Sequence, residues 1–143
     1  MILKRCEKLP TKDKQGKPNG FLVTIFNPHD GLVAEAQHPK QVYMTVVAPG
    51  TVKGPHLHQK RWSFFTCIKG NVVVVMRTTE GYREYESGDD HGYAMIQVPG
   101  GTPAALFNPH GEEARVLTLA SHAWTRSDPD DYPVSFDDYT FKR

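Results

Sequence analysis

Residues 50–70 read GTVKGPHLHQKRWSFFTCIKG, and the rest of the chain is best interpreted outward from them. This stretch sets His56 and His58 one residue apart behind a Gly-Pro turn, and an aromatic run follows them up to Gly70. Alternate residues of an extended segment point to the same side, so both imidazoles are predicted to enter one space. Two imidazoles on one face can bind a metal or transfer protons near neutral pH, because the pKa of histidine is about 6.5. The pair is therefore the leading candidate for a functional site.

The composition is that of one ordinary domain with no charged or apolar segment of unusual length. Its 143 residues carry 17 basic and 16 acidic side chains, and no basic stripe suited to a phosphate backbone is visible. Nucleic acid is therefore not expected as a partner. No apolar run is long enough to cross a bilayer, and the start MILKRCEKLP lacks the apolar region of a signal peptide. We expect no membrane association and a cytoplasmic location.

The two cysteines do not suggest a disulfide. Cys6 and Cys67 form no CxxC motif, and Cys67 lies within an apolar segment where a thiol packs as a small hydrophobic group. Both are expected to be free.

Short segments rich in β-branched and aromatic residues recur along the chain between turn sequences such as SGDDHG and PGG. Many short strands without a long amphipathic helix favour an antiparallel sandwich or barrel. Residues 10–20 are predicted to form a loop, and the tail is predicted to hold one helical turn, with Ser127 or Asp128 as its N-cap and Pro129 near its first position. The expected strands are 21–26, 41–48, 62–68, 71–78, 82–86, 93–98, 104–108 and 114–120.

The segment NVVVVMRT at 71–78 is apolar on both faces, whereas a strand with one wet face should alternate. Its outer face is therefore expected to be covered, either by an N-terminal strand or by a second subunit. We favour the second subunit, and hence a homodimer.

Four residues of the central stretch stand where the first motif of a cupin has them: Gly50, His56, His58 and Gly70. The PGG at 99–101 followed by Asn108 matches part of a second motif. The chain resembles the cupin superfamily. That resemblance implies a single cupin domain over residues 1–143, all-β, built as a double-stranded antiparallel jelly roll with a short C-terminal helical turn and with its site inside the barrel.

Within this superfamily the layout resembles the sugar-nucleotide 3,4-ketoisomerases. The matching segments are Val-Tyr-Met at 42–44, the turn KGPHLHQ at 53–59, and a tail with Asp-Asp-Tyr at 130–132. More loosely, the chain is similar to the dTDP-4-dehydrorhamnose 3,5-epimerases, with His56 in the place of their catalytic base. These resemblances imply a nucleotide-linked 4-keto-6-deoxysugar substrate, most simply a dTDP-linked one, a role in deoxysugar or surface-polysaccharide biosynthesis, and no cofactor.

The departures from the cupin pattern bear on metal binding. Ser63 and Ala104 stand where a metal-binding cupin has its glutamate and its further histidine, so two of four ligands remain. A conventional cupin metal site is therefore disfavoured, and none is predicted. Two alternatives stay open: a cupin that binds a sugar or nucleotide without chemistry, and a metalloenzyme that uses His91 or His122 as an unforeseen ligand.

Specific roles follow for eight residues, and simpler structural explanations compete with them. The histidine pair beside a turn could be exposed and inert. Tyr43 could instead pack in the core, Lys60 and Arg61 could form a solvated corner, and Trp62 could belong to an apolar core. The functional assignment is His56 and His58 for proton transfer, Tyr43 as a phenolic donor, Lys53, Lys60 and Arg61 for a diphosphate, and Trp62 or Tyr93 for stacking on a base.

Overall fold

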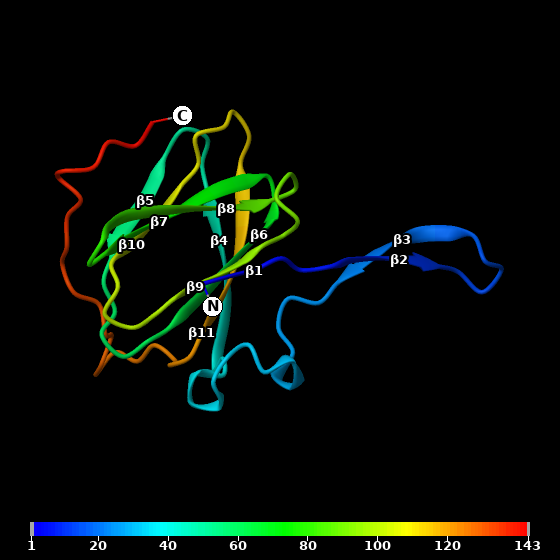
Figure 1. Ribbon diagram of the computed structural model, residues 1–143, viewed down its shortest axis with the longest axis horizontal. Coiled ribbons are helices and arrows are strands. Elements are labelled where there is room, and N and C mark those ends of the chain that lie inside the picture. The colour runs from blue at the N-terminus through cyan, green and yellow to red at the C-terminus, as the bar shows by residue number, and fades with distance from the viewer. Residues whose placement is uncertain (1, 143) are drawn as a thin grey trace.

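The computed structural model describes residues 2–142 as two antiparallel sheets packed face to face, from which a two-stranded arm extends (Figure 1). The strand order is β1-β9-β6-β11-β4 in the five-stranded sheet and β5-β10-β7-β8 in the four-stranded sheet. This arrangement confirms the all-β, jelly-roll fold class. The strands of the two sheets are β1 (Leu3–Lys4), β4 (Gln41–Val47), β5 (Val52–His56), β6 (Ser63–Lys69), β7 (Asn71–Thr78), β8 (Gly81–Gly88), β9 (Met95–Val98), β10 (Ala104–Phe107) and β11 (Ala114–Ala120).

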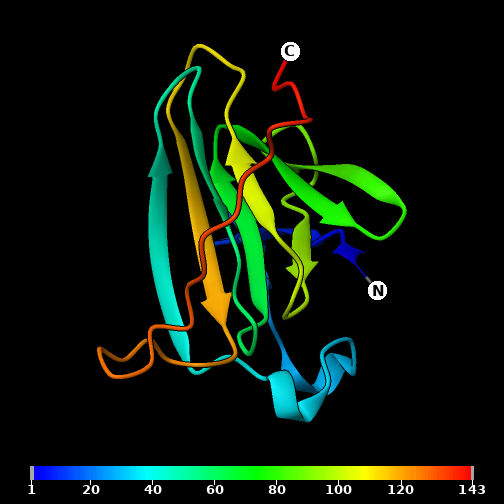
Figure 2. The ribbon, with the colours of Figure 1, turned by 90° about the vertical axis from the view of Figure 1, so that its left-hand side faces the viewer.

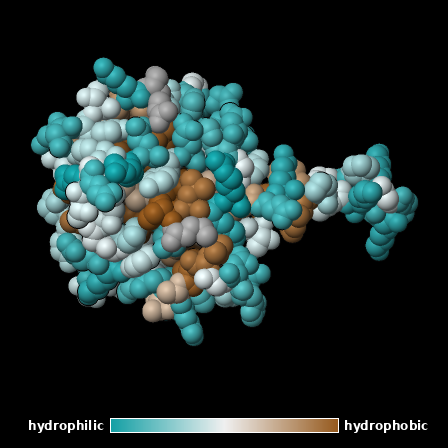
Figure 3. Space-filling view, viewed as in Figure 1, coloured by the Kyte–Doolittle hydropathy of each residue, from teal (hydrophilic) through white to brown (hydrophobic). Residues whose placement is uncertain are grey.

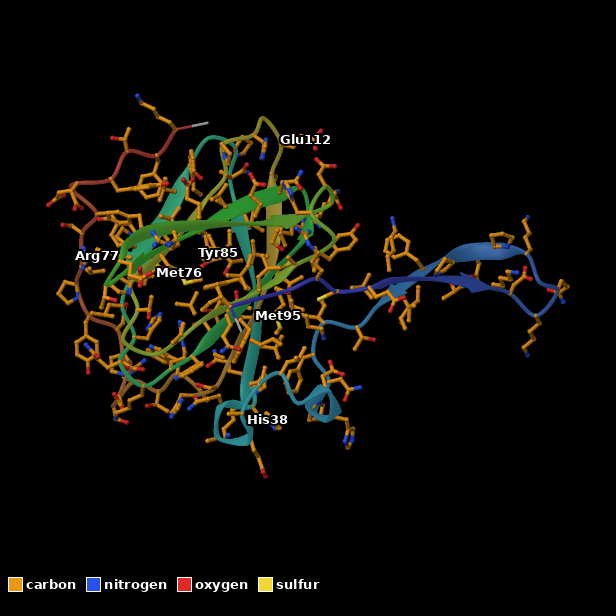
Figure 4. All side chains as sticks on the ribbon, in the orientation of Figure 1. His38, Met76, Arg77, Tyr85, Met95 and Glu112 are labelled. Atoms are coloured by element: carbon orange, nitrogen blue, oxygen red, sulfur yellow. The ribbon has the colours of Figure 1, made fainter. Side chains whose placement is uncertain are left out.

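The main core lies between the two sheets and consists of side chains from alternate positions. Val74 and Met76 of β7 face Cys67 of β6 and Val116 of β11, and all four are almost completely buried. Met76, labelled in Figure 4, lies on the inner side of the four-stranded sheet. Burying one valine side chain contributes about 1.5–3 kcal/mol, so this layer is a main source of stability.

The hairpin between β6 and β7 is confirmed at Lys69-Gly70-Asn71. Gly70 has φ of +74°, and a Cβ there would lie 2.7 Å from the carbonyl oxygen of Glu113. Only glycine meets both requirements without strain.

The outer face of β7 is covered, but by neither of the two partners expected from the sequence. Val73 and Val75 pack against Phe136 of the C-terminal tail, whose rings at Tyr139 and Phe141 extend the same apolar cluster. Figure 2 shows the tail, coloured orange to red, running along the four-stranded sheet. The two-faced apolar pattern of β7 therefore reflects a strap from the same chain, and it no longer supports a second subunit.

The helical turn predicted near Ser127 is wrong. Among the described residues after β11, none is helical. Of the two predicted caps, Asp128 pairs with Lys60 and Ser127 contacts Thr125. The nearby Asp130 accepts hydrogen bonds from distant backbone N–H groups.

Two short 3₁₀ helices, η1 (Pro28–Asp30) and η2 (Glu35–Gln37), lie in the link before β4. This link packs Phe26 and Val33 against the outer face of the five-stranded sheet, next to Phe64. The ring of His38, labelled in Figure 4, meets Phe26 edge-on. Both faces of this sheet are thus covered over much of their area.

The arm consists of β2 (Lys8–Lys12) and β3 (Pro18–Val23), which pair only with each other. The sequence predicted a loop over 10–20 and a strand over 21–26. Because the alternating pattern of this segment is weak, only the pairing in three dimensions reveals the hairpin.

Both cysteines are buried and free, as predicted. In the described part of the chain, we find no helix with the length and apolar character needed to cross a membrane.

Candidate functional site

A cavity of about 300 Å³ lies between the sheets, with walls from both sheets, from the loop after β5 and from the C-terminal tail. It contains five of the eight residues assigned from the sequence. These are Tyr43, Lys53, His56, His58 and Arg61.

The two histidines enter this cavity together. His56 ends β5, and Leu57 forms an isolated bridge with Tyr132 of the tail, so the segment stays extended up to His58. The two rings are nearly parallel, at 16°, with centroids 6.3 Å apart. The predicted shared space for the imidazoles is therefore present.

Asp130 holds the loop that follows the histidines. Its carboxylate accepts backbone N–H hydrogen bonds from Gln59 at 2.9 Å, Lys60 at 3.1 Å and Arg61 at 2.8 Å. Burial alone would raise the pKa of this carboxyl, but the three N–H donors outweigh it and the pKa is lowered. Asp130 also adopts the left-handed conformation, with φ of +49°, which aspartate tolerates better than most residues. Asp130 is thus the anchor between the tail and the site.

Asp130 also sets the tautomer of His58. The Nδ1 atom of His58 lies 2.6 Å from the carbonyl oxygen of Asp130, and its Nε2 atom lies 2.7 Å from Nη2 of Arg61. Because a guanidinium can only donate, Nε2 accepts and Nδ1 carries the proton. Burial lowers the pKa of His58; the hydrogen bond to Asp130 opposes this, and the charge of Arg61 lowers the pKa further. His58 is thus a neutral imidazole whose Nε2 lone pair accepts a hydrogen bond from Arg61.

His56 has a different partner. Its Nδ1 atom lies 3.8 Å from Oδ1 of Asp131, and both side chains are more than half exposed. Asp131 also lines the cavity. The carboxylate of Asp131 therefore lies beside the imidazole of His56 at the wall of the cavity.

Two buried polar atoms of the cavity wall lack a hydrogen-bond partner within residues 2–142. They are Nε of Arg61 and Oγ of Ser63. The guanidinium of Arg61 also lies 5.9 Å from the ring centre of Tyr43 and 3.4 Å from its hydroxyl. Unpaired buried polar atoms are costly, so these two are suited to a polar ligand.

Three assigned residues lie outside this cavity. Trp62 packs in the apolar cluster on the outer face of the five-stranded sheet, and the hydroxyl of Tyr93 donates to Asp89 at 3.0 Å. Their placement does not suit the predicted stacking on a base, because neither side chain lines a cavity that contains the histidines. Lys60 lines a neighbouring cavity of about 190 Å³ and pairs with Asp128 at 2.7 Å.

Trp124 is the aromatic side chain that the sequence reasoning missed. It is 54% exposed and lines both cavities. The available signal was the position of this tryptophan within a polar stretch of the tail, without neighbouring apolar residues that would indicate a core strand.

The cavity does not have the donors of a cupin metal site. Ser63 and Ala104 both line it, and Ala104 lies opposite His56 in the pairing of β10 with β5. They offer a hydroxyl and a methyl group where carboxylate and imidazole ligands are needed, and the cationic Arg61 faces Nε2 of His58.

The third ligand that the metalloenzyme alternative needs is not brought into place. His91 lies 3.4 Å from Glu86, and His122 contacts Ser121. No three His, Cys, Asp or Glu side chains in the described range 2–142 are grouped closely enough to share a metal ion. The residues present therefore do not fit a metal ion.

A small jelly roll with a histidine pair in a cavity between its sheets is a cupin. The chain belongs to the FdtA family, described as WxcM-like, C-terminal, whose family model matches residues 10–142. Comparison with curated protein sequences finds no match.

Solved structures with the same fold share little sequence with the chain. A dTDP sugar isomerase from Desulfovibrio desulfuricans G20 superposes with a TM-score of 0.77 at 13% identity, covering 94% of this chain and 83% of that one. A dTDP-4-dehydrorhamnose 3,5-epimerase from Bacillus anthracis str. Ames, solved with TDP and PPi bound, gives 0.72 at 15% identity, covering 94% and 78%. The capsular polysaccharide assembling protein CapF from Staphylococcus aureus gives 0.61 at 19% identity, covering 88% of this chain and 34% of CapF. At these identities the likeness shows the fold.

Proposed function

We propose that the chain is an isomerase that moves the ketone of a nucleotide-linked 4-keto-6-deoxysugar from C4 to C3. The observation that carries this proposal is the histidine pair in the cavity, in which Nδ1 of His58 donates to the carbonyl oxygen of Asp130 and Nε2 is the accepting nitrogen, held by Arg61. Family membership and the likeness to a dTDP sugar isomerase support the same substrate class.

The proposed chemistry needs only proton transfers. The C4 ketone acidifies the C3 hydrogen, and His58 removes that proton to leave an enediolate across C3 and C4. Return of the proton to C4, while the O3 hydroxyl proton passes by way of His56 to O4, gives the 3-keto sugar. We assign the hydroxyl of Tyr43, which lines the cavity, as the hydrogen-bond donor to the developing oxyanion. Proton transfer of this kind typically contributes about 10²- to 10⁴-fold in rate.

An epimerase is the second candidate, because it shares the first half of this mechanism. Return of the proton to C3 from the opposite face would invert that centre instead of moving the ketone. The pairing of His56 with Asp131 and the likeness to a 3,5-epimerase favour this alternative. Analysis of the product formed in deuterated water separates the two reactions. An isomerase incorporates solvent deuterium at C4, whereas an epimerase incorporates it at C3.

Nucleoside diphosphates are expected to stabilise the protein against heat. A ligand that binds only the folded state stabilises it by about 2.7 kcal/mol at one hundred times its Kd, which for a chain of this size raises Tm by roughly 5–10 °C. The measurement compares thymidine, uridine and guanosine diphosphates, with the nucleosides without phosphate as controls.

If one diphosphate gives a saturable increase in Tm, sugars linked to that nucleotide are the substrates to test for C3 proton exchange. No shift with any of them, together with no exchange, would contradict the proposal. Binding without exchange would instead identify a cupin that holds a sugar nucleotide without chemistry.

We also propose a homodimer held by the arm, working in the cytoplasm. Leu9, Phe21 and Leu22 of the arm are between 41% and 55% exposed, and a two-stranded hairpin alone is only marginally stable in water. Figure 3 shows that the tip of the arm is hydrophilic, whereas apolar side chains gather where it joins the body. Each copy also exposes Val42 and Met44 on β4, an edge strand, so two copies can cover one another.

The variant Phe21→Ser with Leu22→Ser is expected to raise the dimer dissociation constant at least about tenfold, because burial of each side chain contributes about 1.5–3 kcal/mol. Sedimentation equilibrium measures this constant. Lys14→Ala at the arm tip is the matched control and should leave it unchanged. A wild-type monomer at micromolar concentration would rule the dimer out.

A further inference from the structure

Arg61 and His58 cannot keep their present contact while His58 acts as a base. The contact of 2.7 Å uses the Nε2 lone pair of His58, and that lone pair is the one that would accept a substrate proton. Once protonated, Nε2 would be a donor facing a donor, and two positive charges would lie side by side. Proton transfer to His58 therefore requires the guanidinium to leave first.

The guanidinium has an unmet bonding need and a path to a ligand. Its Nε atom is buried without a partner among residues 2–142, and Arg61 is part of the wall of both cavities. Lys53 lines the larger cavity and Lys60 the smaller, so Arg61 is the cation that faces both. Arginine binds diphosphate oxygens in a bidentate manner, which would satisfy Nε and one terminal nitrogen together.

We propose that Arg61 is a substrate-operated cover on His58: it occupies the Nε2 lone pair in the free protein, and the diphosphate of the substrate draws it away. The base is thereby released only when the anionic part of the substrate is bound. This inference rests on the proposed function. It gives Arg61 two successive partners and makes chemistry at the sugar depend on the nucleotide part of the substrate.

The protonation of His58 responds to several neighbouring groups. Arg61 lies on its Nε2 side, Asp130 and Asp131 lie on the tail, His56 stacks alongside, and Tyr43 contacts Arg61 from β4. Among these, Arg61 and His56 are the groups that can place positive charge beside the ring.

The test follows the ring nitrogens of His58 by ¹⁵N NMR in the full chain, with its signals assigned from a His58→Gln variant. In Arg61→Gln the pKa of His58 is expected to rise, because a positive charge is removed. The ¹⁵N chemical shift of Nε2 in the neutral ring should also change, because Nε2 no longer accepts a hydrogen bond from arginine. Lys53→Gln is the matched control, since it removes a positive charge from the same cavity without touching His58. It should leave the neutral-ring Nε2 signal in place.

Thymidine, uridine and guanosine diphosphates are then added to the wild type, and binding is measured separately by calorimetry. The diphosphate that binds is expected to move the neutral-ring Nε2 signal to the position seen in Arg61→Gln. An unchanged Nε2 signal at saturation would overturn the cover while leaving the proposed function intact. An Arg61→Gln protein with the wild-type pKa and Nε2 signal of His58 would also overturn it. Absence of binding by all three, with no C3 exchange on sugar nucleotides, would overturn both.

Discussion

Exchange of the C3 proton of a bound 4-keto sugar nucleotide is expected to fall at least about a hundredfold in His58→Gln. Formation of the 3-keto product, also followed by NMR, is expected to fall by a similar factor in His56→Gln, because His56 carries the later transfer from O3 to O4. Glutamine keeps a polar side chain of similar length but cannot take up a proton near neutral pH. The matched control is His29→Gln, which changes an exposed histidine on η1, far along the chain from the cavity residues. The rate of deuterium incorporation, followed by NMR, measures the effect.

The pH dependence gives this prediction a second readout. His58 acts as a base only when neutral, so exchange should decline as the pH falls through its pKa, which burial and Arg61 place below the ordinary value. In Arg61→Gln this acid limb should move to higher pH. A wild-type rate of C3 exchange in His58→Gln, or a wild-type rate of product formation in His56→Gln, with folding intact, would contradict the role assigned to that histidine.

Asp130→Ala is expected to lower the free energy of unfolding by at least about 3 kcal/mol, since hydrogen bonds to a charged group contribute about 1.5–3 kcal/mol each. Three backbone N–H groups lose their acceptor at once, and alanine is also strained at a φ of +49°. Asp130→Asn is the matched variant: it tolerates this conformation and keeps one acceptor oxygen, so its loss should be smaller. Denaturant unfolding measures both.

The lowered pKa of Asp130 also predicts how the stability of the folded protein changes with pH. The pKa of Asp130 is lowered in the folded protein, so its contribution is fully present above the unfolded value of about 3.9 and is lost as the pH falls through the lower folded value. Asp130→Asn should lack this part of the acid dependence. A variant as stable as the wild type at pH 7, with the same loss in acid, would show that the tail does not hold the loop.

Most strands could be predicted because their signal is local. The segments around Asn71–Thr78 and Ala114–Ala120 are rich in β-branched residues, bounded by turns, and agree with β7 and β11. The hairpin at Gly70 was equally readable, since its conformation is required by a turn of only a few residues. The strands β2 and β5 and the first half of β3 were missed, because they carry polar, Gly and Pro residues that are held extended only by their pairing partners. The second half of β3 overlaps the predicted strand 21–26.

The candidate site divides in the same way. The pair His56 and His58 could be predicted because the spacing of alternate residues in an extended chain is a local property. Trp124, which lines the cavity, and Asp130, which holds the loop after the histidines, could not, because they belong to a tail more than sixty residues beyond the histidine pair. The aspartates of this tail suit a helix cap equally well as a local pattern, and only their distant N–H partners decide between the two.

By itself, the sequence determined the all-β class, the turn that carries the two histidines and the absence of a cupin's usual metal ligands at Ser63 and Ala104. Each of these depends on residue type and on spacing within one segment. Only the tertiary structure decided that the tail covers β7, that Asp130 orients His58, and that Arg61 occupies the lone pair of His58. These features depend on contacts between segments that are far apart in the sequence. The chemistry of a side chain determines what kind of partner it can bind, but not where in the chain that partner lies.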